Sequence, residues 1–312
     1  MNDYRRLKDG IEKGDFRALA RGLTFVENEI ASSSDLLKSI SINQHIPVIG
    51  ITGPPGAGKS TLVNAILSHF VDSGKKIAVL AVDPTSPFNF GSLLGDRIRM
   101  AAQFNKPNVF IRSIATRGSL GGISAKTLEM VDLIRSSTFD LILIETVGVG
   151  QSEVEIAGLA DKTIVVLVPE SGDEIQNIKS GLMEIAQAFV VNKSDREGAA
   201  TFANNLKKLM TQQHQTIPVF KTVADKNEGI EALCKWLIEP ELTNNERRNF
   251  LLAEKAFRII QQKRTADIDK IKLREDIAVE VLKSDFNIYR FVENRLNIGT
   301  SEARLKTPDS RL

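Results

Sequence analysis

The feature that most constrains this chain is a glycine-rich stretch, Gly53-Pro54-Pro55-Gly56-Ala57-Gly58-Lys59-Ser60-Thr61. It follows the apolar run 46–51 and opens a segment of helical character, 62–71. The stretch fits the pattern G-x-x-x-x-G-K-[ST], which is expected between a strand and a helix. Glycines let the backbone curl until several N–H groups point inward, and the helix start adds partial positive charge. The sequence therefore predicts a loop that binds a nucleoside triphosphate.

Two side chains of this loop have predicted roles of their own. Lys59 would reach the β- and γ-phosphates as a compact cation, and the Ser60 hydroxyl would bind Mg²⁺. A glycine-rich turn before an ordinary helix is the alternative, but pattern and context together favour the nucleotide. The candidate nucleotide-binding residues of the loop are Gly53, Pro54, Pro55, Gly56, Ala57, Gly58, Lys59, Ser60 and Thr61.

Short β-rich runs alternate with helical segments over the middle of the chain. The runs are 47–52, 76–82, 109–113, 141–144, 163–168, 189–191 and 218–220. Such alternation predicts βαβ units, hence an α/β fold of the P-loop NTPase type with a mostly parallel, doubly wound sheet. Ligands in such sheets bind beyond the carboxyl ends of the strands, so functional residues are expected just after the runs.

The pattern predicts three parts. Residues 1–45 form an N-terminal helical extension, in which Leu19, Leu23, Val26 and Ile30 recur at helical spacing. Residues 46–243 form the nucleotide-binding domain. Residues 244–312 form a C-terminal helical arm, which packs on its own chain or pairs with a second subunit.

Composition excludes several classes of function. The 312 residues carry a formal charge of +2, with 41 basic and 39 acidic side chains, so charge gives no reason to expect a nucleic-acid partner. No apolar stretch is long enough to cross a bilayer, so no membrane partner is expected. A lone cysteine, Cys234, rules out an internal disulfide and is expected in the core, which favours a cytoplasmic protein.

Two acidic residues close apolar runs. Asp83 directly follows the second run, and it can approach Mg²⁺ at the phosphates only if the first two strands are parallel. The alternative is that Asp83 only forms a turn before Pro84. Glu145 follows the run 141–144 at the position of a Walker B acid. Three residues later, Gly148 can bring its backbone N–H to the γ-phosphate. Gln151 is either a water-positioning residue or a structural one.

A second glycine-bearing loop, 91–100, carries Asp96, Arg97 and Arg99. This mixture suits a switch segment that contacts the metal ion and the γ-phosphate. Solvated helix positions are an equal alternative for both arginines.

The base is predicted to be guanine from Asn192-Lys193-Ser194-Asp195, which follows the run 189–191. Asp195 can accept hydrogen bonds from the guanine N1–H and 2-amino group, which adenine cannot supply, while Lys193 lies along the ring. Four letters alone are weak evidence. Their place after the P-loop, an Asp-Pro loop and an acid-x-x-Gly makes the series specific, and it predicts GTP and GDP as ligands.

Together these stretches resemble a known family. The chain is similar to the methylmalonyl-CoA mutase-associated GTPases, also called the MeaB/ArgK type, within the SIMIBI class of P-loop GTPases. The resemblance covers residues 15 to about 240 and rests on 53–61, 82–88, 94–100, 145–153, 172–181 and 192–195, with the N-terminal helix around 17–28.

The resemblance implies roles that the residues alone do not fix. It implies that Ser60, Asp83, Asp96 and Glu145 surround Mg²⁺, that Lys59 and Arg99 are catalytic candidates, and that Lys179 lies on a further switch. It also implies a homodimer held by the C-terminal arm, and as partner an adenosylcobalamin-dependent acyl-CoA mutase whose cofactor loading and protection are gated by GTP hydrolysis.

Two stretches depart from the family pattern. Pro169-Glu170-Ser171-Gly172 replaces the usual Pro-Gly-x-Gly, and residues 222–227 lack the expected Ser and Gly of the guanine-side loop, where the Ala224 backbone N–H is the group still expected to serve.

Two other functions are alternatives to a mutase-associated GTPase. A metal-insertion GTPase of the nickel type needs a His/Cys cluster, whereas His45, His69, His214 and Cys234 are widely spaced. A kinase linked to amino-acid transport is the second alternative, and no H-R-D catalytic loop supports it.

Overall fold

The computed structural model describes residues 3–30, 32–83, 103, 106–115, 125–146, 156–172, 182–212, 217–239, 253, 256–257, 259–261 and 263–304. The chain divides into two compact units, Met1–Ala256 and Phe257–Leu312. The predicted boundary at 243/244 lies outside the described residues and stays a prediction.

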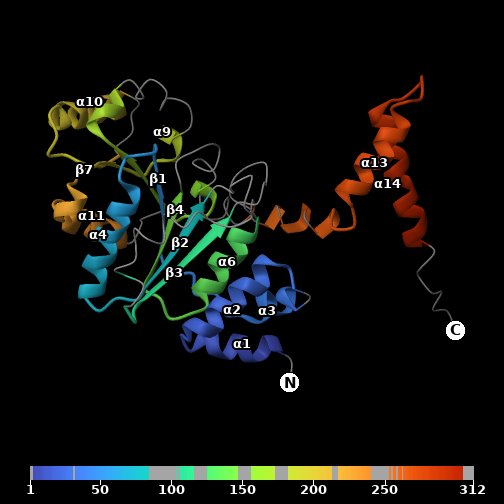
Figure 1. Cartoon of the computed structure of the whole chain (residues 1–312), viewed down its shortest axis with the longest axis horizontal. Helices are drawn as coiled ribbons and strands as arrows, with labels where there is room; N and C mark the ends of the chain where they lie inside the picture. Colours follow the sequence, from blue (N-terminus) through green and yellow to red (C-terminus); the bar gives the residue numbers. More distant parts are fainter. Residues whose placement is uncertain are drawn as a thin grey trace. The chain divides into compact units, whose positions relative to one another are not determined.

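The first unit is built around a seven-stranded sheet whose neighbouring strands are all parallel (Figure 1). Its order is β3-β2-β4-β1-β5-β6-β7. The strands are β1 (Val48–Thr52), β2 (Ile77–Asp83), β3 (Val109–Ala115), β4 (Leu141–Thr146), β5 (Lys162–Leu167), β6 (Ala188–Val191) and β7 (Val219–Lys221). All seven predicted runs are strands, which confirms the α/β fold and its parallel sheet.

Two strands extend further than their apolar runs. Glu145 was expected to follow β4, but it lies within the strand, opposite Ile51 of β1 and Ala81 of β2. Asp83 is likewise the last residue of β2, opposite Ala115 of β3. The prediction ended β4 too early because backbone pairing with neighbouring strands continues past the apolar residues. Both carboxylate-bearing positions therefore lie at the carboxyl edge of the sheet.

Helices cover both faces of the sheet (Figure 1). On one face α4 (Lys59–Asp72) and α11 (Ile230–Ile238) share a core with strand residues such as Ile49 and Leu143. The opposite face carries α1 (Asp3–Glu12), α2 (Phe16–Glu27), α3 (Ser33–Ser39) and α6 (Ala125–Arg135), packed with Val48 and Ile142. There α9 (Leu182–Ile185) and α10 (Ala199–Gln212) pack with β5 and β6. Side chains alternate between the faces as the strand period requires.

The N-terminal helices pack against the sheet and α6. Leu19, Leu23 and Val26 of α2 are buried, but the helix ends at Glu27, so the expected fourth position, Ile30, lies outside it and is 39% exposed. Asn28 is the C-cap residue, and its backbone N–H donates to the carbonyls of Thr24 and Val26. The helix therefore ends before the last position of the apolar pattern.

A short ion pair ties this extension to the sheet. The Arg112 guanidinium of β3 lies 2.6 Å from the Glu27 carboxylate at the end of α2. Because both side chains are largely covered, the pair is less exposed to screening by salt than a surface pair.

Helix α11 is fixed at its carboxyl end by Lys162 of β5. The Lys162 ammonium donates to the carbonyls of Trp236 (2.8 Å) and Glu239 (2.7 Å), and it lies 4.7 Å from the centre of the Trp236 ring. Cys234 on the same helix is fully buried, and burial raises the pKa of its thiol to about 12. The predicted core position of Cys234 is thereby confirmed.

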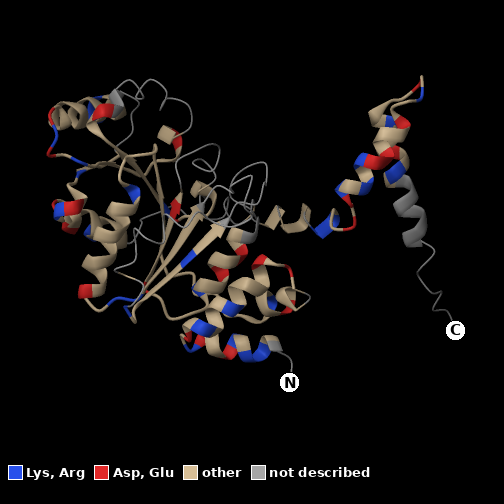
Figure 2. Cartoon of the chain, viewed as in Figure 1, with Lys and Arg blue, Asp and Glu red and all other residues tan. Residues whose placement is uncertain are grey.

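Charged side chains lie mainly on helices and loops, and the described strands carry few (Figure 2). None of the helices in the described part of the chain has the length and apolar character needed to span a membrane.

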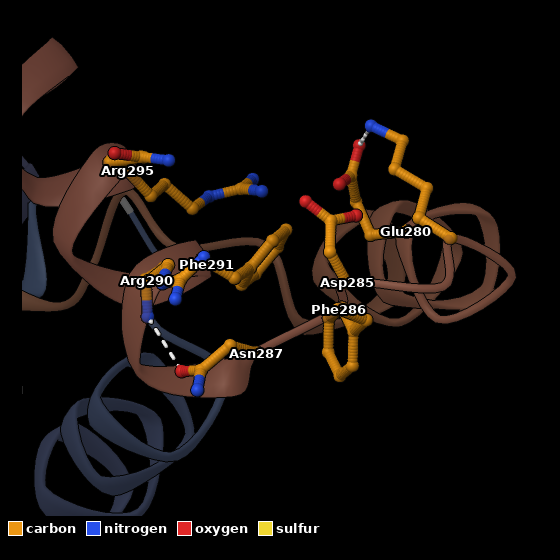
Figure 3. A pocket seen from close by; sticks show the side chains of 9 residues that line it. Glu280, Asp285, Phe286, Asn287, Arg290, Phe291 and Arg295 are labelled. Carbon is orange, nitrogen blue, oxygen red and sulfur yellow. Dashed lines mark hydrogen bonds and ion pairs between the residues drawn. The ribbon is translucent and has the colours of Figure 1, made fainter.

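The second unit is a helical hairpin of α13 (Lys270–Glu280) and α14 (Ile288–Arg304). The Asp269 carboxylate caps α13, and an ion pair between Arg295 and Asp276 joins the two helices. A pocket of about 440 Å³ lies beside the turn, lined by Phe286 and Phe291 and by charged side chains of both signs (Figure 3). α13 has no buried residue. The hairpin therefore leaves much of its apolar surface exposed.

Candidate functional site

The glycine-rich loop connects β1 to α4 at the carboxyl edge of the sheet. Gly53 has φ +140° and passes so close to β5 that a Cβ would lie 2.1 Å from the Val166 carbonyl oxygen. Gly56 also has a positive φ, +78°, but a Cβ there would meet no atom within 4 Å. Gly58, in the left-handed region, is the N-cap residue of α4. The loop thus has the strand-loop-helix context that the motif requires.

Gly53→Ala is expected to destabilise the first unit by about 2–4 kcal/mol, because the new methyl group collides with backbone that cannot move aside. The matched control is Gly56→Ala, for which only the strain of a positive φ, about 1–2 kcal/mol, is expected. Urea unfolding followed by fluorescence of the single tryptophan, Trp236, measures both. Equal unfolding midpoints for the two variants would contradict this account of the loop.

Lys59 is the first residue of α4 and is only 7% exposed. Its ammonium donates to the carbonyls of Gly53 (2.7 Å) and Pro54 (3.0 Å). The charge is therefore held over the curled loop, where a phosphate group would lie if the loop binds one.

Ser60 and Glu145 meet beside this loop. The Ser60 hydroxyl donates to the Glu145 carboxylate at 2.7 Å, and Glu145 is 6% exposed. A hydroxyl and a carboxylate are oxygen donors of the kind that Mg²⁺ prefers, so this pair fits the predicted metal site. Asp83 ends the neighbouring strand β2 at the same edge of the sheet. Its side chain lies outside the described residues.

Asn192, directly after β6, connects three loops. It is 2% exposed, and its amide nitrogen donates to the Ala57 carbonyl at 3.0 Å. Its amide oxygen accepts from the Thr222 hydroxyl (3.1 Å) and from the Ala224 backbone N–H (3.2 Å). The side chain thus holds the phosphate-binding loop against the segment after β7.

The next residues of this motif face the same loop. Lys193 has φ +53°, and its ammonium donates to the Gly56 carbonyl at 2.8 Å. Asp195 accepts a hydrogen bond from Lys226 at 2.8 Å, and this contact is the largest cause lowering the pKa of the Asp195 carboxyl. Lys226 belongs to η4 (Ala224–Lys226), the short turn that also carries Ala224.

The stretch Pro169-Glu170-Ser171-Gly172, which differs from the family pattern, forms a short helical turn after β5, η3 (Pro169–Gly172). Glu170 forms an ion pair with Arg196, and the Arg196 hydrogen bond is the first cause lowering the pKa of the Glu170 carboxyl. The residue that replaces the family's glycine thus contacts the segment directly after Asp195.

Several predicted site residues lie outside the described residues. They are Asp96, Arg99, Gly148 and Lys179, together with the alternatives Arg97 and Gln151. Their roles stay predictions. Of the remainder, the structure brings the loop 53–61, Glu145, Asn192, Lys193 and Ala224 together through the contacts above.

Sequence reasoning missed Thr222, Lys226 and Arg196 as contributors to this region. Thr222 and Lys226 contact Asn192 and Asp195 because β6 and β7 are neighbours, and Arg196 faces Glu170 because β5 is beside β6. No local spacing indicates these contacts. The order of the strands brings these residues together.

Comparison with known proteins bears on the same segments. The family described as methylmalonyl Co-A mutase-associated GTPase MeaB matches residues 19–270. A Pyrococcus horikoshii protein named as a candidate GTPase is 41% identical over 283 residues, covering 87% of this chain and 86% of that protein. A Mus musculus protein named methylmalonic aciduria type A homolog, mitochondrial, is 37% identical over 248 residues, which cover 72% of this chain and 60% of that protein.

A solved structure described as LAO/AO transport system kinase superimposes with a TM-score of 0.66, covering 96% of this chain and 99% of that one. At 23% identity this likeness supports the fold alone. The family match spans the phosphate-binding loop, both carboxylate strands and the base motif. The chain belongs to the methylmalonyl Co-A mutase-associated GTPase family, MeaB, and is a P-loop GTPase.

Proposed function

We propose that this GTPase acts as a chaperone of an adenosylcobalamin-dependent acyl-CoA mutase of the methylmalonyl-CoA mutase kind, gating the loading of the cofactor and protecting the mutase. The observation that carries the proposal is the family match over residues 19–270, whose description names association with methylmalonyl-CoA mutase. The name of the mouse relative, which refers to methylmalonic aciduria, supports the same assignment.

The nucleotide would lie along the carboxyl edge of the sheet. The loop 53–61 would surround its phosphates, with Lys59 as the cation, and the guanine would lie between Asp195 and the segment around Ala224. Asn192 supports this placement because it joins the Ala57 carbonyl to the Ala224 N–H, so the phosphate and base subsites are held at a fixed separation.

Mg²⁺ would be held by Ser60 and Glu145, with Asp83 and Asp96 as further candidates. When bound, the ion would neutralise charge that develops on the β- and γ-phosphates. Described residues at the site then have their own tasks: Lys59 binds and orients the phosphates, and Asp195 orients the base.

Hydrolysis would proceed by attack of water on the γ-phosphorus, which forms one P–O bond and breaks the bond to the β-phosphate oxygen, releasing GDP and phosphate. The Lys59 ammonium stabilises charge on the leaving group because it lies over the loop that cradles it. Arg99 and Lys179 are the candidates for additional cations, and Gly148 is the candidate N–H donor to the γ-phosphate.

The chaperone role is tested with the purified full chain and a purified adenosylcobalamin-dependent mutase from the same organism. We expect GTP hydrolysis to be slow alone and faster with the mutase, and complex formation to differ between GDP and a non-hydrolysable GTP analogue. The mutase together with Lys59→Ala provides the background rate. GTP hydrolysis unchanged by the mutase, with no complex in either nucleotide, would sink the proposal.

The arm is proposed to hold two copies of this chain together. Apolar side chains stand largely exposed on it: Leu282 is 84% exposed, Tyr289 77% and Ile271 72%. Exposed large apolar residues gathered on one small unit are typical of a protein interface. A second copy of this chain would cover these side chains, because the family resemblance implies a homodimer.

Leu282→Glu is expected to weaken dimerisation at least roughly 10-fold, because burying an unpartnered carboxylate in an apolar interface is costly. Gln261→Glu adds the same charge at an exposed polar position of the arm and is the matched control. Light scattering after size exclusion, over a series of concentrations, separates the 34.4 kDa monomer from its dimer. A wild-type chain that remains monomeric throughout would contradict the dimer.

Neither alternative function gains support from the described residues. Within them, no group of three His, Cys, Asp or Glu side chains is placed to hold a metal ion, as a nickel-inserting protein would require. The likeness to the transport system kinase concerns the fold and carries no activity.

A further inference from the structure

A lysine that belongs to no recognised motif contacts the residue predicted to read the base. The Lys226 ammonium lies 2.8 Å from Asp195 Oδ2, and the two side chains are 53% and 41% exposed. Ion pairs this exposed contribute little to folding. Its position on the base-reading carboxylate therefore suggests a different use.

The turn that carries Lys226 is held in one conformation. Val223 and Glu228 exchange backbone hydrogen bonds of 3.1 and 3.2 Å, and the Lys226 N–H donates to the Val223 carbonyl at 3.0 Å. Gly229 has φ +73°, and a Cβ there would lie 2.1 Å from the Lys221 carbonyl oxygen. The backbone of Lys226 is thus fixed relative to β7 before any ligand binds.

Another residue of the same segment, Val223, cannot bind the Asp195 carboxylate. Val223 lies in the stretch 222–227, and its apolar side chain is 4% exposed. It offers no hydroxyl to Asp195. Lys226 is the side chain of this turn that does contact the carboxylate, and it lies three residues further along.

The contact leaves the carboxylate able to bind a base. An ionised carboxylate has about four lone-pair sites, of which Lys226 uses one and a guanine edge would use two. Among the described residues, no side chain other than Lys226 is seen to donate to Asp195. The Asp195 carboxyl is ionised near neutral pH with or without Lys226, whose hydrogen bond lowers its pKa further, and the ionised form is the one that accepts both guanine hydrogens.

We propose that Lys226 is a positioning residue for guanine recognition, whose ammonium holds the Asp195 carboxylate in the orientation that accepts the guanine N1–H and 2-amino group. The inference rests on the proposed guanine site and deepens it. Lys226 acts through Asp195, so it affects the choice of base and not the transfer of the phosphoryl group.

The test compares Lys226→Met with two other variants of the full chain. Lys226→Arg keeps a cationic donor. Lys75→Met removes an equally exposed ion pair, Lys75 with Asp140 at 3.2 Å, whose side chains are 47% and 40% exposed and which lies at the amino end of β2. Equilibrium titrations with GDP, IDP and ADP give the affinities, since inosine lacks the 2-amino group and adenine lacks both donors.

For Lys226→Met we expect the Kd for GDP to rise roughly 2- to 10-fold, the cost of ordering one side chain at binding. The Kd for IDP rises less, and that for ADP is unchanged, so the preference for guanine falls. Lys226→Arg restores it, and Lys75→Met does not alter it. In turnover, the KM for GTP rises while kcat is unchanged. In the Asp195→Asn background, Lys226→Met no longer changes the preference between GDP and ADP.

Four results would overturn the inference. Tighter GDP binding by Lys226→Met would make Lys226 a competitor of the base. An equal loss for GDP, IDP and ADP would indicate general damage to the site. If the wild-type chain prefers GDP and Lys226→Met leaves the Kd ratios among GDP, IDP and ADP unchanged, the role of Lys226 is refuted and the guanine site stands. If the wild-type chain has no preference for GDP over ADP, both the role of Lys226 and the guanine site are refuted.

Discussion

Lys59→Ala is expected to weaken GTP binding by roughly 30- to 3000-fold and to abolish measurable hydrolysis. The Lys59 ammonium is held over the curled loop by the Gly53 and Pro54 carbonyls, at 2.7 and 3.0 Å. Truncating one member of a covered, hydrogen-bonded charge pair costs about 2–5 kcal/mol, and each 1.4 kcal/mol is tenfold in affinity. Titration with a fluorescent GTP analogue measures the loss.

Two controls accompany this variant. Lys75→Ala removes a lysine of the same chain far from the loop, and its GTP affinity is expected to match that of the wild type. Thermal unfolding of Lys59→Ala shows whether the fold is kept. A folded Lys59→Ala chain that binds GTP within threefold of the wild type would contradict the assignment of the phosphate subsite.

Asp195→Asn is expected to reduce the preference for GDP over ADP by roughly 100-fold or more. The amide presents an NH₂ donor where the carboxylate presented acceptors, so one of the two guanine donors is left without a partner. Sites built to hydrogen-bond a ligand discriminate by factors of up to about 10⁴–10⁵ when that partner is missing. Titrations with GDP, XDP and ADP measure the change.

A gain in XDP affinity by Asp195→Asn distinguishes a changed base preference from general damage to the binding site. Xanthine carries a 2-oxo acceptor in place of the 2-amino donor, so the new amide can donate to it and XDP affinity should rise. Because Asp195 is 41% exposed, the exchange is expected to leave folding nearly unchanged. An Asp195→Asn chain that keeps the wild-type preference for GDP over ADP would show that another residue reads the base.

Local signals predicted most of the fold. All seven strands follow from short apolar runs. The signal is strongest for β1, β4, β5 and β6, because strands buried at every position need mostly apolar residues. The order of the strands could not be predicted, because each crossover can place the next strand on either side. The carboxyl end of β4 could not be predicted either, because its pairing with β1 and β2 continues beyond the apolar residues to Glu145.

The site shows the same division between local and distant information. The phosphate-binding loop and the Asn192–Asp195 motif were found because their residues are adjacent in sequence. Lys226 and the Glu170 to Arg196 ion pair were not found, because these contacts join segments that follow different strands. Helical spacing places Ile30 in the helix that ends at Glu27, because spacing alone does not show where a helix ends.

The most direct test of the central claim is an equilibrium titration of the purified full chain with GDP and with ADP in magnesium buffer. If Asp195 reads a guanine whose phosphates lie in the loop 53–61, GDP binds at least about 100-fold more tightly than ADP. Equal affinities, or tighter binding of ADP, would contradict the account.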